Sequence, residues 1–324
     1  MELNKKAFFF TTIAIALSVV IILSYNVYTN YKLKDEMGVI ETRINTMDSF
    51  IKDLENDLEN AIFIVGFRSL LSIEDYMMDQ NKFLNDANPP ATPALNTAFK
   101  DVFEKGTINS QSMFLMRNNT FLNWTERMKI QADKTDILLD FTVNSVTISH
   151  SEPWKVDISV NLDIDIKDKK NTATWAVDNK IFTKQINISS EISGNHRFVD
   201  PLYLVNNNGK VNNTIRKTTV PDFSGGNLVT HLNNNYYIEN TDSPSYLMRF
   251  ENDSSSSVYG IESLANVDLI SSLSLGPSGK TAVDHLYFDP GSSTTDCNIE
   301  GMEISHPWFY LDSDHLGFYG AVCV

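Results

Sequence analysis

The feature that most constrains this chain is an uncharged, largely apolar run near its N-terminus, from Ala7 to Tyr25. At about 1.5 Å per residue, a helix over this run matches the roughly 30 Å thickness of a hydrocarbon core. A cleavable secretory signal has a shorter apolar core that leads into small residues, whereas this run continues into Asn26, Val27 and Tyr28. The run therefore predicts a single-pass membrane helix that is not removed at its far end.

The orientation in the membrane does not follow from positive charges alone, because Lys5 and Lys6 precede the run and two further lysines follow it. The only cysteines, Cys297 and Cys323, indicate one disulfide in an oxidising compartment; two buried free thiols are the alternative. Sequons that accept glycans on a translocated chain occur at Asn118, Asn123, Asn187, Asn212 and Asn252. We therefore expect a cell-membrane protein with a cytoplasmic N-terminus and an extracellular C-terminal part.

Length and composition predict a sizeable core outside the membrane, because the chain has 324 residues of which 42% are hydrophobic. The net charge of −15 excludes nucleic acid as a partner, since phosphates would be repelled. A solvated acidic surface is the simpler interpretation of that charge.

An amphipathic stripe follows the membrane run, and no proline separates the two. Apolar residues recur every three or four positions at Met37, Ile40, Ile44, Met47, Ile51, Leu54 and Leu58. One continuous helix from about Lys5 to about Leu58 is predicted, and Asn60 and Gly66 are the candidate positions for a break. Either the stripe packs on the chain's own domain, which we favour, or it pairs with another copy in a coiled coil.

A long helix that is first apolar and then amphipathic, preceded by a short basic leader, resembles the type IV pilins. The leader Lys5-Lys6-Ala7, followed by Phe8, is similar to an archaeal class III signal peptide. The resemblance implies cleavage between Ala7 and Phe8 and association with other pilin-like subunits through the stripe. Many pilins carry Glu at the fifth mature position, where this chain has Thr12, so the resemblance does not extend to the usual contact with a neighbouring amine.

Two further helices are expected before any sheet. Thr92 is placed to cap a helix that has Pro93 in its first turn and ends at Gly106. A second helix is expected near Phe121 to Ile130. Together with the stripe, they form a helical part that could cover a sheet.

The clearest strand pattern extends from Val156 to Lys167, where apolar and polar residues alternate without interruption. Residues 140–149 alternate in the same way with a change of phase near Asn144 and Ser145, which predicts a β-bulge. A short connection predicts a hairpin between these two runs, and residues 172–192 add a third strand. Such an antiparallel sheet would rest on the amphipathic helix.

From residue 194 the apolar runs are shorter, and we expect a second, β-rich region tied down by the cysteines. Its candidate strands are residues 236–238, 246–250, 282–289 and 308–312, and residues 260–269 are a candidate short helix. The predicted class is α+β, in four parts. These are the basic leader and transmembrane helix (1–31), the helical stalk and helices (32–105), the antiparallel β domain (106–193) and the β-rich C-terminal region (194–324).

Sequence motifs for catalysis or for binding a cofactor or metal are incomplete throughout the chain. The segment from Leu275 to Thr281 is similar to the end of a phosphate-binding loop, but Ser274 replaces the first glycine and a strand is expected to follow. The spacing of Asp312 and Asp314 matches part of a calcium-binding loop, but Cys323 stands at the position where a bidentate Glu is required. No histidine spacing is typical of a metal site. We therefore predict no catalytic, cofactor or metal residue.

The predicted function is that of a membrane-anchored, extracellular, pilin-like surface protein with a structural or adhesive role. A monomeric, single-pass binding or sensor module is the alternative, and an extracellular enzyme is the third hypothesis. Membrane lipid is the expected partner in each case.

Overall fold

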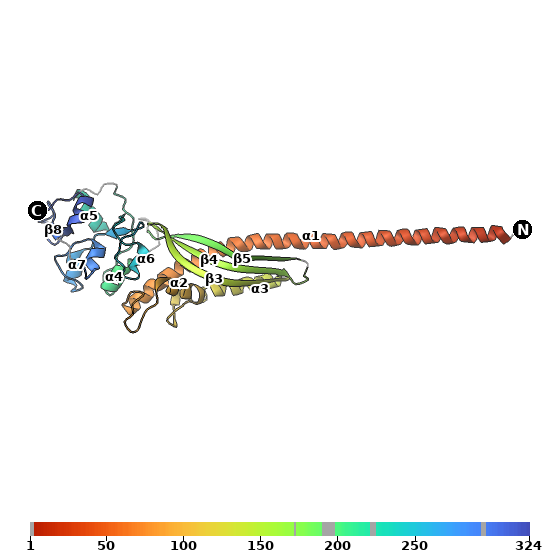
Figure 1. Cartoon of the computed structure of the whole chain (residues 1–324), viewed down its shortest axis with the longest axis horizontal. Coiled ribbons are helices and arrows are strands. Elements are labelled where there is room, and N and C mark those ends of the chain that lie inside the picture. The colour runs from red at the N-terminus through yellow and green to blue at the C-terminus, as the bar shows by residue number, and fades with distance from the viewer. Residues whose placement is uncertain (1–2, 172, 190–197, 221–224, 293–295) are drawn as a thin grey trace.

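The computed structural model describes residues 3–171, 173–189, 198–220, 225–292 and 296–324. A long helix carries the N-terminus at its free end, and the C-terminus lies at the opposite end of the molecule (Figure 1). The class is α+β, as the sequence predicts: long and short helices accompany antiparallel sheets.

Helix α1 extends from Leu3 to Gln80 without interruption, 78 residues in all. The single helix predicted over the membrane run and the stripe is therefore confirmed, and it is longer than expected. At the helical rise it measures about 115 Å. The candidate break at Gly66 is wrong, and the reason lies in packing. A Cβ at this position would overlap Ile158 Cδ1 in the sheet, so the glycine allows a close approach of helix and strand.

Helix α2, Leu95–Lys105, begins later than predicted. Ala94 is its N-cap residue, and the Leu95 N–H instead donates to Glu251 Oε1 at 2.7 Å. Thr92 serves the preceding loop, where its hydroxyl donates to Phe83 O and accepts from Asp86 N. The predicted end is confirmed: Gly106 follows with φ of 73°, in the left-handed region that favours glycine.

A short hairpin of β1 (Thr107–Ile108) and β2 (Gln111–Ser112) leads through the 3₁₀ turn η1 (Phe114–Met116) to α3 (Phe121–Lys134). Helix α3 confirms the second predicted helix. Thr120 and Asn123 form its capping box, in which the Thr120 hydroxyl accepts from Asn123 N and the Asn123 side chain accepts from Thr120 N.

The main sheet has the order β3-β4-β5, with β3 at Ile137–Glu152, β4 at Lys155–Asp168 and β5 at Thr174–Asn187. Both pairings are antiparallel, as predicted, and the bulge falls between Val143 and Ser145. The third predicted run extended to residue 192; β5 ends at Asn187, and residues 190–192 lie outside the described part.

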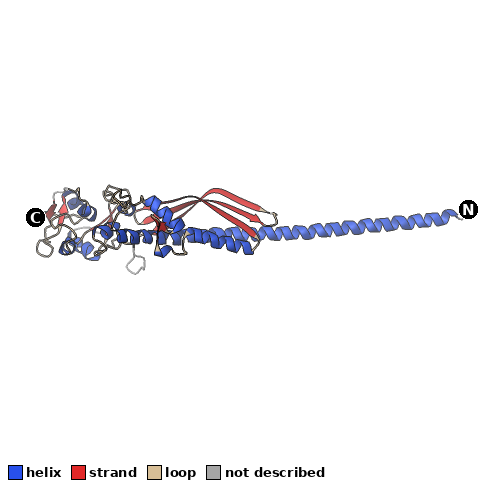
Figure 2. Cartoon of the chain, turned by 90° about the horizontal axis from the view of Figure 1, so that it is seen from below, coloured by secondary structure: helices blue, strands red, loops and turns tan. Residues whose placement is uncertain are grey.

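Helices α1, α2 and α3 cover one face of this sheet, and the sheet runs along α1 for part of its length (Figures 1 and 2). Every second residue of β4 from Val156 to Ile166 is buried, so the alternation that predicts the strand also defines its covered face. These side chains join Leu54, Leu58 and Ile62 of α1 in one core cluster.

The C-terminal region folds from short elements around a second cluster that includes Leu264, Val283 and Phe309. The first cluster also reaches into this region through Tyr246 and Phe250. The elements are α4 (Pro201–Asn206), α5 (Gly225–Asn234), β6 (Tyr237–Glu239), α6 (Tyr246–Arg249), β7 (Ile261–Ser263), α7 (Val267–Ser272), α8 (Asp284–Phe288), β8 (Asp296–Asn298), β9 (Tyr310–Asp312) and α9 (Ser313–Phe318).

The prediction that this region is β-rich is wrong, because its described residues contain more helix than strand. The expected strand at 246–250 is helix α6, where Ser245 caps the first turn and Tyr246 and Phe250 lie on one buried face. The expected strand at 282–289 is helix α8, and the expected helix at 260–269 begins with strand β7. A short apolar run is compatible with either a helix or a strand, and here tertiary contacts decide between the two. The expected strands at 236–238 and 308–312 are present as β6 and β9.

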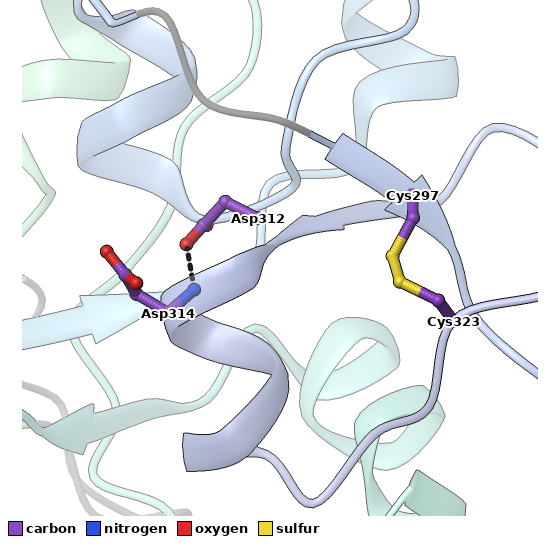
Figure 3. The surroundings of a disulfide bond; sticks show 4 residues. All are labelled: Cys297, Asp312, Asp314 and Cys323. Atoms are coloured by element: carbon purple, nitrogen blue, oxygen red, sulfur yellow. Dashed lines mark hydrogen bonds between the residues drawn. A yellow bond between two sulfur atoms is a disulfide. The ribbon is translucent and has the colours of Figure 1, made fainter.

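Cys297 in β8 and Cys323 form the predicted disulfide (Figure 3). The bond joins positions 26 residues apart and fixes the last residues of the chain beside the β8–β9 pair. In the chain-entropy model, a loop of this size contributes about 3 kcal/mol.

Candidate functional site

The N-terminal half of α1 is not covered by the rest of the described chain. It contains an apolar window of mean hydropathy 2.0, none of which is buried by the rest of the protein. Large apolar side chains from Phe9 to Leu23 are 41–70% exposed. Exposed apolar surface on this scale is typical of a segment that meets a membrane or a partner. This helix is long and apolar enough to cross a membrane.

Aromatic and basic residues mark one end of the apolar window. Tyr25, Tyr28 and Tyr31 are 68–76% exposed, and Lys32 and Lys34 follow. Tyrosines are enriched at membrane–water interfaces, where the ring meets lipid and the hydroxyl meets water. This stretch is therefore suited to the boundary of the membrane. At the other end, Lys5 to Phe8 lie within α1, but their side chains are outside the described part.

The amphipathic stripe is divided between two environments. Met47, Leu54 and Leu58 are buried in the first core cluster, and Ile51 is partly buried against it. The favoured interpretation, packing on the chain's own domain, therefore holds for this half. Met37, Ile40 and Ile44 remain 42–69% exposed. Of the seven residues predicted to contact other subunits, only these three present an open apolar surface.

Ion pairs align the covered half of α1 with the sheet. Lys180 Nζ lies 2.6 Å from Glu55 Oε1, and Lys184 Nζ lies 2.7 Å from Glu59 Oε2. Glu55 and Glu59 are one helical turn apart, and the two lysines face them from β5. These half-exposed pairs contribute little energy each, but they fix the register of helix and strand. Arg43 adds a contact at 2.8 Å to the buried Asp168, at the end of the sheet nearest the apolar part of α1.

The five sequon asparagines differ in exposure. Asn118, Asn187, Asn212 and Asn252 are exposed. Asn123 is half-buried, and its side-chain oxygen is held by the capping box of α3. Because the Asn123 side chain is half-buried and held by the cap, the structure favours the other four positions.

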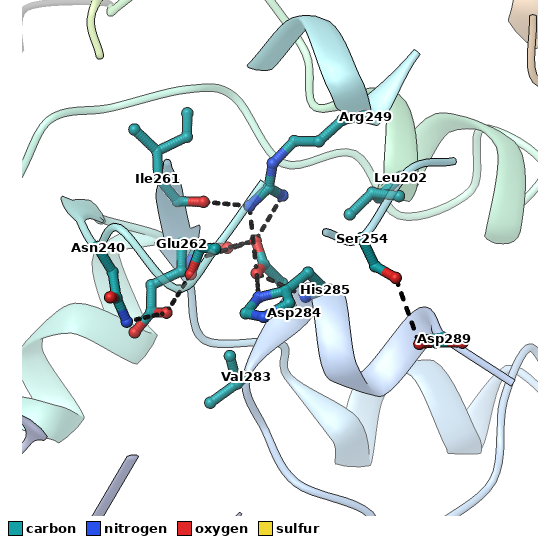
Figure 4. A network of polar contacts seen from close by, with 12 residues as sticks. Leu202, Asn240, Arg249, Ser254, Ile261, Glu262, Val283, Asp284, His285 and Asp289 are labelled. Atoms are coloured by element: carbon teal, nitrogen blue, oxygen red, sulfur yellow. Dashed lines mark hydrogen bonds and ion pairs between the residues drawn. The ribbon is translucent and has the colours of Figure 1, made fainter. Parts of the chain in front are cut away.

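A buried polar network in the C-terminal region was not found from the sequence. Arg249 on α6 donates to Asp284 Oδ2 at 2.8 Å and to the carbonyl of Ile261 (Figure 4). It also donates to Asp200 Oδ2 at 2.6 Å. All three charged side chains are fully buried. Burial opposes ionisation of Asp284, but Arg249 and then His285 outweigh it and hold its pKa below the ordinary value.

Glu262 is the centre of the second half of this network. It accepts from Asn240, Ser243 and Tyr319, and His315 Nε2 lies 3.2 Å from it. The other His315 nitrogen lies 2.8 Å from Asp312 Oδ1. Burial opposes charge on His315, but the two carboxylates outweigh it and raise the pKa of this imidazole to about 10. His315 is therefore a buried cation at neutral pH.

This network contains catalytic residue types but has a structural arrangement. Arg249, Asp284 and Glu262 have no exposed surface, so a substrate could not reach them without rearrangement. Asp312 caps α9 by accepting from the backbone N–H groups of Asp314 and His315, and Figure 3 shows the contact with Asp314. In the sequence Glu262 lies between Ile261 and Ser263, so no local pattern marks these positions.

Helix α8 begins at Asp284, so the expectation of a strand after the Gly-Lys-Thr segment is wrong. The Lys280 ammonium donates to the carbonyls of Tyr287 and Asp289, and the Thr281 hydroxyl donates to Asp312. Both side chains thus hold the local fold. Among the six histidines of the chain, His196 lies outside the part that the structure describes.

Two cavities flank the exposed ring of Phe114 on η1. One, of about 420 Å³, is lined by Lys105 and Arg117, and the other, of about 280 Å³, is lined by Ser72, Asp75 and Asp79. They are open depressions at the surface of the part formed by α1, α2 and α3, and they have opposite charge.

The chain matches no protein-family model, no curated protein and no solved structure. Functional inference therefore rests on the features described above.

Proposed function

We propose that this chain is a membrane-anchored surface protein of the type IV pilin-like kind, with a structural or adhesive role. One observation carries the proposal: a single helix is uncovered and apolar over its first part and forms the core of a folded domain over its last part. Because α1 is continuous, the domain is held by a rigid rod rather than by a flexible linker.

The orientation we propose places the N-terminus in the cytoplasm and the domain outside the cell. A disulfide between Cys297 and Cys323 fits an oxidising compartment. Four exposed sequons fit an exported surface. The net charge of −15 fits a domain that remains in solution.

The leader is proposed to be processed between Ala7 and Phe8, as the resemblance implies. Mass spectrometry of the membrane-bound protein should then find Phe8 as the mature N-terminus. Lys6→Glu and Ala7→Asp should block processing, because each places a negative side chain where the family peptidase accepts basic and small residues. Lys34→Glu, the matched charge change beyond the membrane helix, should leave processing intact.

The two parts of this proposal can be separated. Normal processing of both leader variants would remove the pilin-like leader while leaving the anchor in place. Release of the wild-type protein from membranes by alkaline carbonate would overturn the anchor itself.

Assembly is proposed to be limited. Thr12 stands where pilins commonly carry Glu, so an incoming subunit lacks a charge-assisted contact in lipid, where an unpaired amine is costly. Only Met37, Ile40 and Ile44 of the stripe remain open for a partner. We expect single anchored subunits or a minor component of a filament formed by other proteins. Long filaments of the purified chain alone, seen by electron microscopy, would contradict this.

A monomeric anchored binding module is the second candidate function. The cavities beside Phe114 favour it, because they place an exposed aromatic ring between two charged depressions.

A further inference from the structure

The smaller cavity beside Phe114 combines one face of α1 with the segment that follows β1. Helix α1 contributes Ser72, Asp75 and Asp79, which are three and four positions apart and therefore share a face. The opposite wall comes from residues 111–114, ending in Phe114. The cavity measures about 280 Å³, which is enough for the end of one side chain.

The two carboxylates in this cavity have no ion-pair partner among the described residues. Asp75 and Asp79 are one helical turn apart, an arrangement of like charges that destabilises a helix. Burial raises the pKa of Asp75, and the charge of Asp79 raises it further. Glu55 and Glu59 of the same helix are neutralised by lysines of β5. The pair at 75 and 79 is left without such a neighbour.

Ser72 provides an independent observation. Its side chain is 1% exposed, it lines the cavity, and its hydroxyl has no hydrogen-bond partner within the described part of the chain. Other helical serines and threonines satisfy their hydroxyls on the preceding turn, as Ser69 does on Val65 O at 2.8 Å. An unsatisfied buried hydroxyl is costly, and a ligand in the cavity would satisfy it.

The exposed ring of Phe114 completes the cavity. It is 83% exposed although its neighbour Met116 is buried, and Arg68 donates to Leu115 O to hold the turn between them. An aromatic face beside unpaired carboxylates suits a cation, because the ring quadrupole adds attraction within about 6 Å. On the other side of the ring, Lys105 and Arg117 line a cavity that would repel the same cation.

We propose that the cavity formed by Ser72, Asp75, Asp79 and Phe114 binds a primary ammonium group, of the kind carried by a lysine side chain. An ammonium has three N–H donors, and the cavity offers acceptors in the carboxylates of Asp75 and Asp79 and the hydroxyl of Ser72, with Gln111 and Ser112 also in its lining. The alkyl chain would lie along Phe114. A divalent metal is a poorer match, because the described residues contain no group of three or more His, Cys, Asp or Glu side chains placed to hold one.

The test uses the full-length protein in detergent micelles at low ionic strength, because screening weakens exposed ionic contacts. Isothermal titration with Nα-acetyl-lysine amide measures binding of the isolated side chain. Cadaverine and a lysine-containing peptide separate the two sources of the group, a free amine and a partner protein. We expect the acetyl-lysine amide to bind, and Asp75→Asn with Asp79→Asn to weaken it at least tenfold.

Two matched controls identify the cavity. Glu41→Gln with Asp53→Asn removes the same two charges from exposed positions of α1 and should leave the affinity within twofold. Arg117→Gln, on the other side of Phe114, should leave it unchanged or slightly higher. Phe114→Ser should weaken binding two- to fivefold, the loss expected for a cation–π contact of about 0.5–1 kcal/mol.

Several outcomes would overturn the proposal. The first is an equal loss of affinity in the Glu41 and Asp53 control, which would indicate that net charge alone drives binding. The second is that the folded wild type binds no amine, and the third is that it binds Ca²⁺ in place of the amines. Circular dichroism of each variant establishes that it is folded. Because the test concerns binding only, it is independent of leader processing and of membrane anchoring.

Discussion

Where β4 packs on α1, the buried side chains are aliphatic and occur at every second position, whereas the C-terminal region combines an apolar cluster with a buried network of charged groups. Val156, Ile158 and Val160 represent the first kind, and Arg249 and Glu262 represent the second. Apolar contacts are non-directional, so many sequences could fill the first core. The buried network needs each donor and acceptor in place, since an unpaired charge in the interior is strongly destabilising.

The largest expected effect tests the charged core. Arg249→Met leaves Asp200 and Asp284 buried without their cation and should cost about 3–5 kcal/mol of unfolding free energy. Hydrogen exchange should locate the loss in residues 198–324 and leave β3 to β5 protected. Lys217→Met removes a half-exposed pair with Glu239 in the same region and should cost under about 1 kcal/mol. Equal stability of the two variants would contradict a structural role for Arg249.

The disulfide should follow in size. Cys297→Ser with Cys323→Ser removes the link between β8 and the end of the chain and should cost about 3 kcal/mol in the chain-entropy model. Denaturant unfolding with and without reductant measures it. The double variant should be insensitive to reductant, and the wild type should lose the same free energy on reduction. A loss of protection in the main sheet would show that the two regions are more tightly coupled than we infer.

A smaller effect tests the close packing of the first core. Gly66→Ala places a methyl group against Ile158 and Ile186 and should cost about 1–3 kcal/mol. Gly38→Ala makes the same change on the same helix where no atom lies within 4 Å, so it should gain up to about 1 kcal/mol of helix stability. Thermal unfolding followed by tryptophan fluorescence compares them. A cost at Gly38 as large as that at Gly66 would argue against the close approach.

A further test concerns titration of the charged core, where stability changes by at most about 1.4 kcal/mol for each pH unit. His315 has a pKa of about 10 in the folded state, above its ordinary value of 6.5. Its contribution is therefore complete below about pH 6.5 and is lost as the pH rises through about 10. Asp312 has a pKa of about 2, so its contribution is complete above about pH 4 and is lost as the pH falls toward 2.

Stability of the C-terminal region should therefore decline between pH 7 and pH 10, and His315→Gln should remove most of this decline. Chemical unfolding at several pH values measures it, with hydrogen exchange in the sheet as the internal comparison. A wild-type region whose stability stays constant across that range would contradict a charged His315.

The first core was predictable because its sequence patterns repeat over many residues. The stripe from Met47 to Leu58 and the alternation from Val156 to Ile166 each repeat often enough to define an element and its buried face. The disulfide pairing was predictable because the sequence contains no other cysteine. Residues 246–250 and 282–289 were read as strands and form helices, because runs this short satisfy both periods.

The sequence by itself determined the long helix, its apolar half, the three-stranded sheet and the disulfide, because each depends on local periodicity or on a unique pairing. Tertiary structure alone decided where the stripe becomes covered, between Ile44 and Met47, since that depends on where the sheet ends along α1. It also decided the network of Arg249, Asp284 and Glu262, and the cavity beside Phe114. Their members come from separate elements, and the energy of a buried charge depends on partners that only the folded chain brings within hydrogen-bond distance.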